Sequence, residues 1–183
     1  MMNTYETERL LLKAPDQNSA AYILDYYKRN KEFLEEWEPV RQPEFYTLEY
    51  QENQLENQLA QIKRGDALRF WLFEKENPEK AIGSFSFTNI SRGAFWSCLL
   101  GYGMDGQSIN RGYMTEALRK GVEIIFGEYG LHRIEANIMP KNARSLRVTE
   151  KLGFVNEGIS RRYLKINGNW EDHIHMVLLN DAV

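Results

Sequence analysis

The chain has 183 residues, a length typical of one domain, and we expect a single domain spanning residues 1–183. Its 23 Lys and Arg residues against 26 Asp and Glu residues give a net charge of −3, so we expect no direct binding to nucleic acid through surplus cations. The single cysteine, Cys98, excludes an internal disulfide and a multi-cysteine zinc site. We therefore expect a cytoplasmic protein, with neither a secretory signal nor a membrane span.

The first half of the chain is predicted to contain two helices and a run of strands. Apolar residues recur at helical spacing over 20–37 and again over 48–62. Gly101 and Gly103, near the end of the last strand of this half, indicate a bulge or a close approach by another backbone or a ligand. Short apolar or alternating runs predict strands at 10–12, 70–73, 82–88 and 95–104.

The second half alternates between helices and strands and ends in a hairpin. Apolar spacing predicts helices over 114–125 and 142–152, and alternation predicts a strand over 134–138. The Asn-Gly-Asn turn at 167–169 predicts a hairpin between two final strands, at 154–166 and 170–179. The order β-α-α-β-β-β-α-β-α-β-β defines a mixed α/β (α+β) domain. It is not the regular alternation of a doubly wound parallel sheet.

A polar loop before the helix at 114–125 is a candidate anion site. Free N–H groups at a helix N-terminus favour a phosphate or pyrophosphate. Asn110 tolerates left-handed geometry, Arg111 adds a positive charge, and Gly112 presents no side chain to an approaching ligand. An ordinary strand–turn–helix connection would use the same residue types. The glycine spacing matches neither a P-loop nor a dinucleotide fingerprint.

The helix predicted over 142–152 is basic in an otherwise acidic chain. Asn142 is a predicted N-cap that accepts a hydrogen bond from the N–H of Arg144 or Ser145. A capped helix with a solvated basic face would show the same pattern. The basic residues are Lys141, Arg144, Arg147 and Lys151.

These segments together resemble the GNAT acetyltransferase superfamily, and within it the RimJ/RimL group of ribosomal-protein alanine N-acetyltransferases. The resemblance covers nearly the whole chain and implies a single-domain GNAT-like fold. Such a fold has a mixed, mostly antiparallel central sheet with splayed strands, flanked by helices. The resemblance rests on residues 7–12, 92–95, 100–102, 112–118, 132–142, 150–154 and 163–173.

The resemblance implies acetyl-CoA as the co-substrate and no metal. It assigns the pantetheine arm to the backbone at the end of a strand, and the pyrophosphate to amides of the glycine loop. Of the family's loop pattern, Gln/Arg-x-x-Gly-x-Gly/Ala, only Gly112 is kept, since Ile109 and Met114 depart from it. The residues implied in CoA binding are Tyr102, Gly103, Met104, Asn110, Arg111, Gly112, Tyr113, Met114, Thr115, Asn142 and Ser145.

Amide formation requires a group that accepts a proton from the amine and a donor that stabilises the oxyanion. Many family members carry a glutamate on the strand that corresponds to residues 97–100, but here this stretch has no carboxylate. Many also use a tyrosine to protonate the sulfur, at the position where this chain has Thr149. Glu135, Tyr163 and Asp172 are therefore the candidate base or relay residues. Each also has a structural explanation: Glu135 as a surface strand residue, Tyr163 as a half-buried aromatic and Asp172 as a salt-bridge partner in the hairpin. Direct attack by the amine, with water taking the proton, fits the sequence equally well.

Two further features have simpler interpretations than catalysis. Cys98 lies in an apolar strand with no histidine near it in the sequence, so we expect a small core residue and not a nucleophile. His173 and His175 share one face of a predicted strand, as the start of a metal site would require. Because no third ligand lies at a suitable spacing, we expect histidines hydrogen-bonded to neighbours.

The leading functional hypothesis is acetyl transfer from acetyl-CoA to the N-terminal alanine of a protein, with a ribosomal protein as the partner. A second hypothesis keeps the chemistry but changes the acceptor to a small amine, an amino acid or an antibiotic. The segment 33–62, which we expect beside the acceptor, would decide between them. A third is a CoA-binding regulatory module without turnover. The sequence does not define an oligomeric state.

Overall fold

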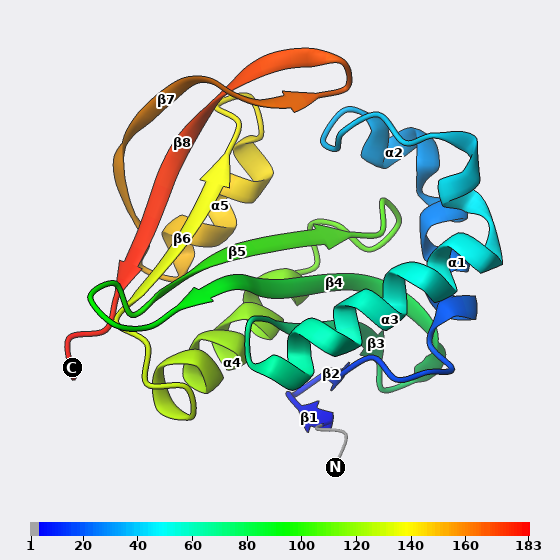
Figure 1. The fold of residues 1–183 in the computed structure, drawn as a ribbon, viewed down its shortest axis with the longest axis horizontal. Coiled ribbons are helices and arrows are strands. Elements are labelled where there is room, and N and C mark those ends of the chain that lie inside the picture. Colours follow the sequence, from blue (N-terminus) through cyan, green and yellow to red (C-terminus); the bar gives the residue numbers. More distant parts are fainter. Residues whose placement is uncertain (1–3) are drawn as a thin grey trace.

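The computed structural model describes residues 4–183 as one eight-stranded sheet with helices on both sides (Figure 1). The strands are β1 (Thr4–Glu6), β2 (Leu10–Lys13), β3 (Leu68–Glu74), β4 (Asn77–Ser91), β5 (Ser97–Met104), β6 (Arg133–Ile138), β7 (Val155–Ile166) and β8 (Asn169–Leu179). The helices are α1 (Ala20–Arg29), α2 (Lys31–Glu35), the 3₁₀ helix η1 (Pro43–Tyr46), α3 (Leu48–Arg64), α4 (Tyr113–Gly127) and α5 (Ala143–Lys151).

The sheet is mixed and mostly antiparallel, as predicted. Its strand order is β1-β2-β3-β4-β5-β6-β8-β7. Every neighbouring pair is antiparallel except β5 and β6, which run parallel. A parallel pair needs a long crossover, and here the crossover contains α4.

The parallel pair is short, and this divides the sheet. Only residues 97–99 of β5 pair with β6, opposite residues 133–135. The rest of β5, up to Met104, keeps its partner on β4 but has no strand partner on the β6 side within residues 4–183. Figure 1 shows β5 and β6 leaving one corner of the molecule and diverging. The predicted splayed strands are therefore present.

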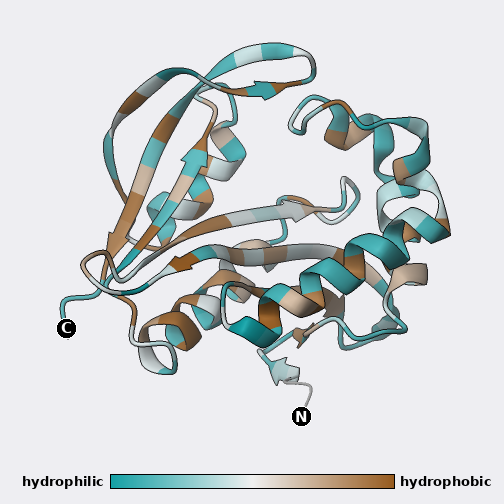
Figure 2. Ribbon diagram, viewed as in Figure 1, coloured by the Kyte–Doolittle hydropathy of each residue, from teal (hydrophilic) through white to brown (hydrophobic). Residues whose placement is uncertain are grey.

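Alternating side chains along the strands divide the core into two layers. On β3, Phe70 and Leu72 join the cluster under α4, whereas Trp71 and Phe73 join the cluster under α1 and α3. Gly121 of α4 lies so close to β4 that an added Cβ would meet the ring of Phe85 at 2.8 Å. Figure 2 shows hydrophobic and hydrophilic residues alternating around α3 and α4, as expected for helices with one buried side.

Two details differ from the prediction. The helix expected over 20–37 is interrupted at Asn30, where ψ rises to 9° and α2 begins in a new direction. The side chain of Asn30 holds this break, because Nδ2 donates to the carbonyl of Tyr26 and Oδ1 accepts from the N–H of Gly106. The second difference is the additional edge strand β1, which pairs with β2.

No helix within residues 4–183 is long and apolar enough to cross a bilayer.

Candidate active site

A cavity of about 600 Å³ opens where β5 and β6 diverge. Its walls come from the end of β5, the loop 108–112, the starts of α4 and α5, and α2. All the residues implied in CoA binding line it, although they are separated by up to 43 positions in the chain. They are Tyr102, Gly103, Met104, Asn110, Arg111, Gly112, Tyr113, Met114, Thr115, Asn142 and Ser145.

The loop before α4 adopts the conformation expected for an amide cradle. Asn110 has φ of 60° and Gly112 has φ of 79°, both in the left-handed region. Gly112 is the N-cap of α4 and has no side chain to occupy the first-turn amides. Arg9 Nη1 donates to the carbonyl of Arg111 at 3.0 Å, and Arg9 also pairs with Glu116 at 2.7 Å. The loop is thus tied to the residue that precedes β2, and its amides can face an anion.

The start of α5 forms the opposite wall. Asn142 Oδ1 accepts from the N–H of Ser145 at 3.1 Å, which confirms the predicted cap. The hydroxyl of Tyr102 donates to the carbonyl of Ser145 at 2.8 Å and so ties β5 to α5. Burial raises the pKa of Tyr102, which keeps this phenol neutral.

Cations gather on the cavity wall. Lys141 does not belong to this group, because it does not line the cavity; its ammonium pairs with Glu171 at 2.9 Å. A positive wall suits the phosphates of a polyanionic ligand. The lining cations are Arg111, Arg144, Arg147 and Lys151.

Glu135, the first candidate base, does not line the cavity. Its Oε1 accepts from His175 Nδ1 at 2.8 Å and its Oε2 from Arg133 at 3.3 Å. Burial alone would raise the pKa of Glu135, but the hydrogen bonds from His175 and Arg133 outweigh it and lower the pKa. Glu135 is therefore an ionised partner in a network on β6 and β8.

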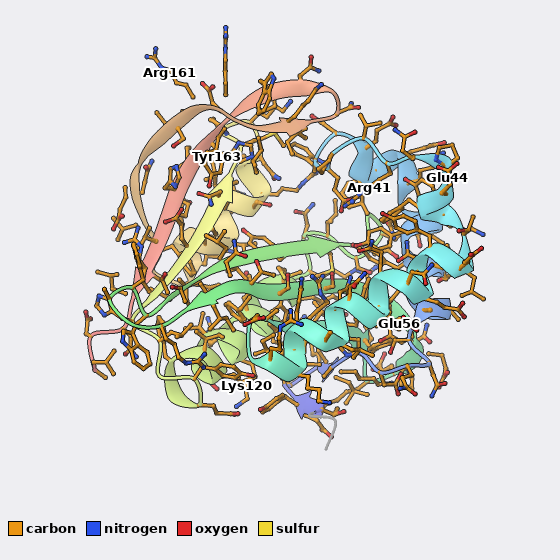
Figure 3. The ribbon with its side chains drawn as sticks, in the orientation of Figure 1. Arg41, Glu44, Glu56, Lys120, Arg161 and Tyr163 are labelled. Carbon is orange, nitrogen blue, oxygen red and sulfur yellow. The ribbon has the colours of Figure 1, made fainter. Side chains whose placement is uncertain are left out.

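Tyr163 and Asp172 also lie outside the residues that line the cavity. The ring of Tyr163, which is labelled in Figure 3, packs against His173 and His175 of β8, with centroid distances of 5.6 and 5.3 Å. Asp172 Oδ1 accepts from the N–H of Arg162 at 2.8 Å. Arg162 has φ of 49°, so this bond stabilises a bend in β7.

Two other titratable residues, Glu38 and His173, do line the cavity. Glu38 follows α2. Nothing in the sequence marks it as a site residue except its place in the segment 33–62, which we expect beside the acceptor. His173 was considered only as one of a pair. Of that pair, His173 reaches the cavity, whereas His175 bonds Ser160 and Glu135.

The structure agrees with the simpler interpretations of Cys98 and of the two histidines. Cys98 is 2% exposed, and burial raises its pKa to about 12, so it is a core residue. His173 and His175 are hydrogen-bonded to neighbours. Residues 4–183 contain no group of three or more His, Cys, Asp or Glu side chains that could hold a metal ion.

Comparison with known proteins defines the class. The family model described as an acetyltransferase (GNAT) domain matches residues 9–155, and the chain belongs to this family. The "Probable N-acetyltransferase YjcK" of Bacillus subtilis is 38% identical over 86% of this chain and 86% of its own. The "[Ribosomal protein uS5]-alanine N-acetyltransferase" of Escherichia coli is 37% identical over 92% of this chain and 86% of its own.

A solved structure extends the comparison to the fold. Mycobacterium smegmatis RimJ, in complex with CoA-disulfide, superposes with a TM-score of 0.91 at 25% identity, covering 99% of this chain and 89% of that one. This protein is therefore a GNAT-type N-acetyltransferase with the expected GNAT-like fold. Within the family, it is of the RimJ/RimL type.

Proposed function

We propose that this enzyme transfers the acetyl group of acetyl-CoA to the N-terminal α-amine of a protein. The proposed acceptor is the N-terminal alanine of a ribosomal protein. The carrying observation is a single cavity that extends from the phosphate-type loop at Gly112 to Glu38 beside α2. One end of this cavity suits a polyanion and the other offers a carboxylate to a cationic amine. The Escherichia coli relative named as a uS5-alanine N-acetyltransferase supports the choice of acceptor.

The residues present fit CoA. The amides at the start of α4 and the left-handed turn at Asn110 and Gly112 suit a pyrophosphate. The unpaired edge of β5 beyond Leu99 leaves backbone groups to bind the extended pantetheine arm. Acetyl-CoA, when bound, supplies the acetyl thioester. Arg144 and Arg147 would neutralise its phosphates.

The acceptor enters on the side of the cavity formed by α2 and the β7–β8 hairpin. The N–H of Asn167, at the hairpin turn, donates to the carbonyl of Glu38 at 2.9 Å. This bond holds the hairpin beside the segment that follows α2, so the two walls form one entrance. Trp37 and Phe33 also line the cavity there and would pack against a small apolar first residue.

A peptide series tests the proposed function. We expect CoA release with a hexapeptide of the uS5 N-terminus that begins with alanine, and much less when the first residue is glutamate or lysine. The matched control is the same peptide with a blocked N-terminus, which should give no release. Robust transfer to free amino acids or polyamines, with none to alanine-initiated peptides, would favour the small-amine acceptor. CoA binding without release for any amine would favour a regulatory module.

A further inference from the structure

We propose that His173 is the catalytic residue that accepts the proton of the acceptor amine, and that Glu38 binds the amine in its ammonium form before this transfer. This inference rests on the proposed function and names the acceptor end of the same cavity. Neither residue belongs to the candidates that the sequence offered. Both come from elements that meet only in the folded chain, the segment after α2 and strand β8.

Elimination among the lining residues leads to this pair. Of the described residues around the cavity, only Glu38 carries a carboxylate and only His173 carries an imidazole, two groups that often act as general bases. Tyr102 is buried and its pKa is raised. The pKa of Tyr113 is raised as well, first by the hydrogen bond with Glu74. The remaining titratable side chains on the walls are cations.

The surroundings of His173 prepare it to act as a base. Its side chain is 3% exposed, and Nδ1 lies 3.1 Å from the carbonyl oxygen of Glu171. A carbonyl can only accept, so Nδ1 carries the hydrogen and Nε2 keeps its lone pair. No other residue in 4–183 forms a hydrogen bond with Nε2 in this structure. The ring of Tyr163 packs against the imidazole, with its centroid 5.6 Å away.

Glu38 has one carboxylate oxygen available for the substrate. Its Oε2 accepts from Arg41 at 3.1 Å, whereas Oε1 accepts no hydrogen bond from the described residues. These contacts with Arg41 orient the carboxylate. The Asn167–Glu38 backbone bond connects this segment to the hairpin that carries His173. Because both side chains line the same cavity, the proposal places the incoming ammonium between the carboxylate of one wall and the imidazole of the other.

The proposed step is balanced in atoms and charge. The acceptor R–NH₃⁺ gives one proton to His173 Nε2, and the freed lone pair forms a C–N bond with the acetyl carbon as the C–S bond breaks. The amide nitrogen releases a second proton, which protonates the CoA thiolate. His173 returns its proton to solvent. Glu38 carries its charge throughout and acts by binding.

Four variants test the inference in the full-length enzyme. His173→Asn retains an N–H donor for the carbonyl of Glu171 and removes Nε2. Its matched control is His175→Asn, on the same face of β8 but outside the cavity lining. Glu38→Gln removes the charge beside the amine, and its control is Glu36→Gln, which is exposed. Melting temperature and CoA affinity of each variant report whether the fold and the co-substrate site remain intact.

We expect His173→Asn to lower kcat for the alanine peptide by ~10²–10⁴-fold, the range typical for loss of a general base, without loss of CoA affinity. His175→Asn should remain close to wild type. Glu38→Gln should act mainly on KM for the peptide, raising it by roughly tenfold or more, since a charge-assisted hydrogen bond is lost. Glu36→Gln should change neither constant.

Further outcomes decide the remaining cases. If His173→Asn does not fold, His173→Ala is assayed with added imidazole, and a rate that rises with imidazole supports the proposal. A kcat for His173→Asn close to that of wild type, or an equal loss in His175→Asn, overturns it and returns the base to the Glu135 network. Wild-type transfer is measured first, so failure of the alanine peptide as an acceptor counts against the proposed function alone. The variants are then assayed with whichever amine is acetylated.

Discussion

Asp105 is the residue whose replacement should show most directly how the loop before α4 is held. It follows β5 and its side chain is only 2% exposed. Its Oδ2 accepts a hydrogen bond from Arg29 Nη1 of α1, and its Oδ1 accepts from the N–H of Gln107 at 2.9 Å. Asp105→Asn keeps an acceptor for Gln107 and removes the charge that faces Arg29.

The expected loss follows from these contacts. A hydrogen bond to a charged group contributes ~1.5–3 kcal/mol. Because the Arg29 side chain is 27% exposed and also pairs with Asp25, solvent and the second carboxylate compensate in part. We therefore expect Asp105→Asn to lower the free energy of unfolding by about 2 kcal/mol. For a domain of this size that corresponds to a fall in Tm of roughly 4–8 °C.

The same contacts predict a pH dependence. Burial alone would raise the pKa of Asp105, but the hydrogen bond from Gln107 and the Arg29 guanidinium outweigh it and hold the pKa below its usual range. A carboxyl whose pKa is depressed by folding stabilises the protein above its unfolded pKa of about 3.9, and this contribution is lost as the pH falls through the folded pKa. The Tm difference between wild type and Asp105→Asn should therefore be constant from pH 6 to 8 and shrink below about pH 4.

Thermal melts followed by circular dichroism at a series of pH values measure both effects. Asp25→Asn is the matched control, because Asp25 pairs with the same arginine but is 56% exposed, and its loss should cost under ~1 kcal/mol. An unchanged Tm for Asp105→Asn at pH 7, or a difference that persists undiminished at pH 3, would refute the reasoning.

Three further predictions concern packing and reactivity. Gly121→Ala should lower the free energy of unfolding, measured by denaturant titration, by about 1–2 kcal/mol. The added Cβ would meet Phe85 at 2.8 Å, and this overpacking exceeds the gain in helix propensity. A more stable variant would contradict the close packing. Asn142→Ala should cost about 1 kcal/mol through loss of the α5 cap and should also weaken CoA binding by calorimetry, whereas Asn142→Asp should retain most of the stability. Burial raises the pKa of Cys98 to about 12. The thiol should therefore react with a maleimide at pH 8 at least ~100-fold more slowly in the folded protein than in urea. Rapid labelling of the native protein would show that β5 is not buried as described.

The elements of the fold were predictable where the local signal and the tertiary structure agree. The turn at Asn167 and Gly168 has positive φ at both residues, as an Asn-Gly hairpin requires, and Asn142 caps α5. The break at Asn30 was not predictable, because it depends on a hydrogen bond to Gly106, 76 positions away. Strand β1 is short and polar, and only its pairing with β2 defines it.

The structure gathers the residues expected on the CoA side around the cavity, whereas none of the three candidate bases lines it. The loop at 110–112 carries its own conformational signal in Asn110 and Gly112. Which strand residues face the cavity depends on register instead. His173 lies at the cavity, whereas His175, two residues on, pairs with Asn137 of β6 and contacts Glu135. Alternation assigns both histidines to one face and cannot say how far along the strand the cavity reaches.

The divergence of β5 and β6 leaves two strand edges open inside the molecule, and open edges are templates for aggregation. Here the two edges face each other across a wedge that the 97–99 pairing closes at its narrow end. The starts of α4 and α5 line the same wedge, and the Tyr102–Ser145 hydrogen bond spans it. A strand from another molecule would have to enter lengthwise between these walls. These two inner edges can thus offer backbone hydrogen bonds to a narrow, flexible ligand while being shielded from the flat edge-to-edge pairing that joins proteins into fibrils.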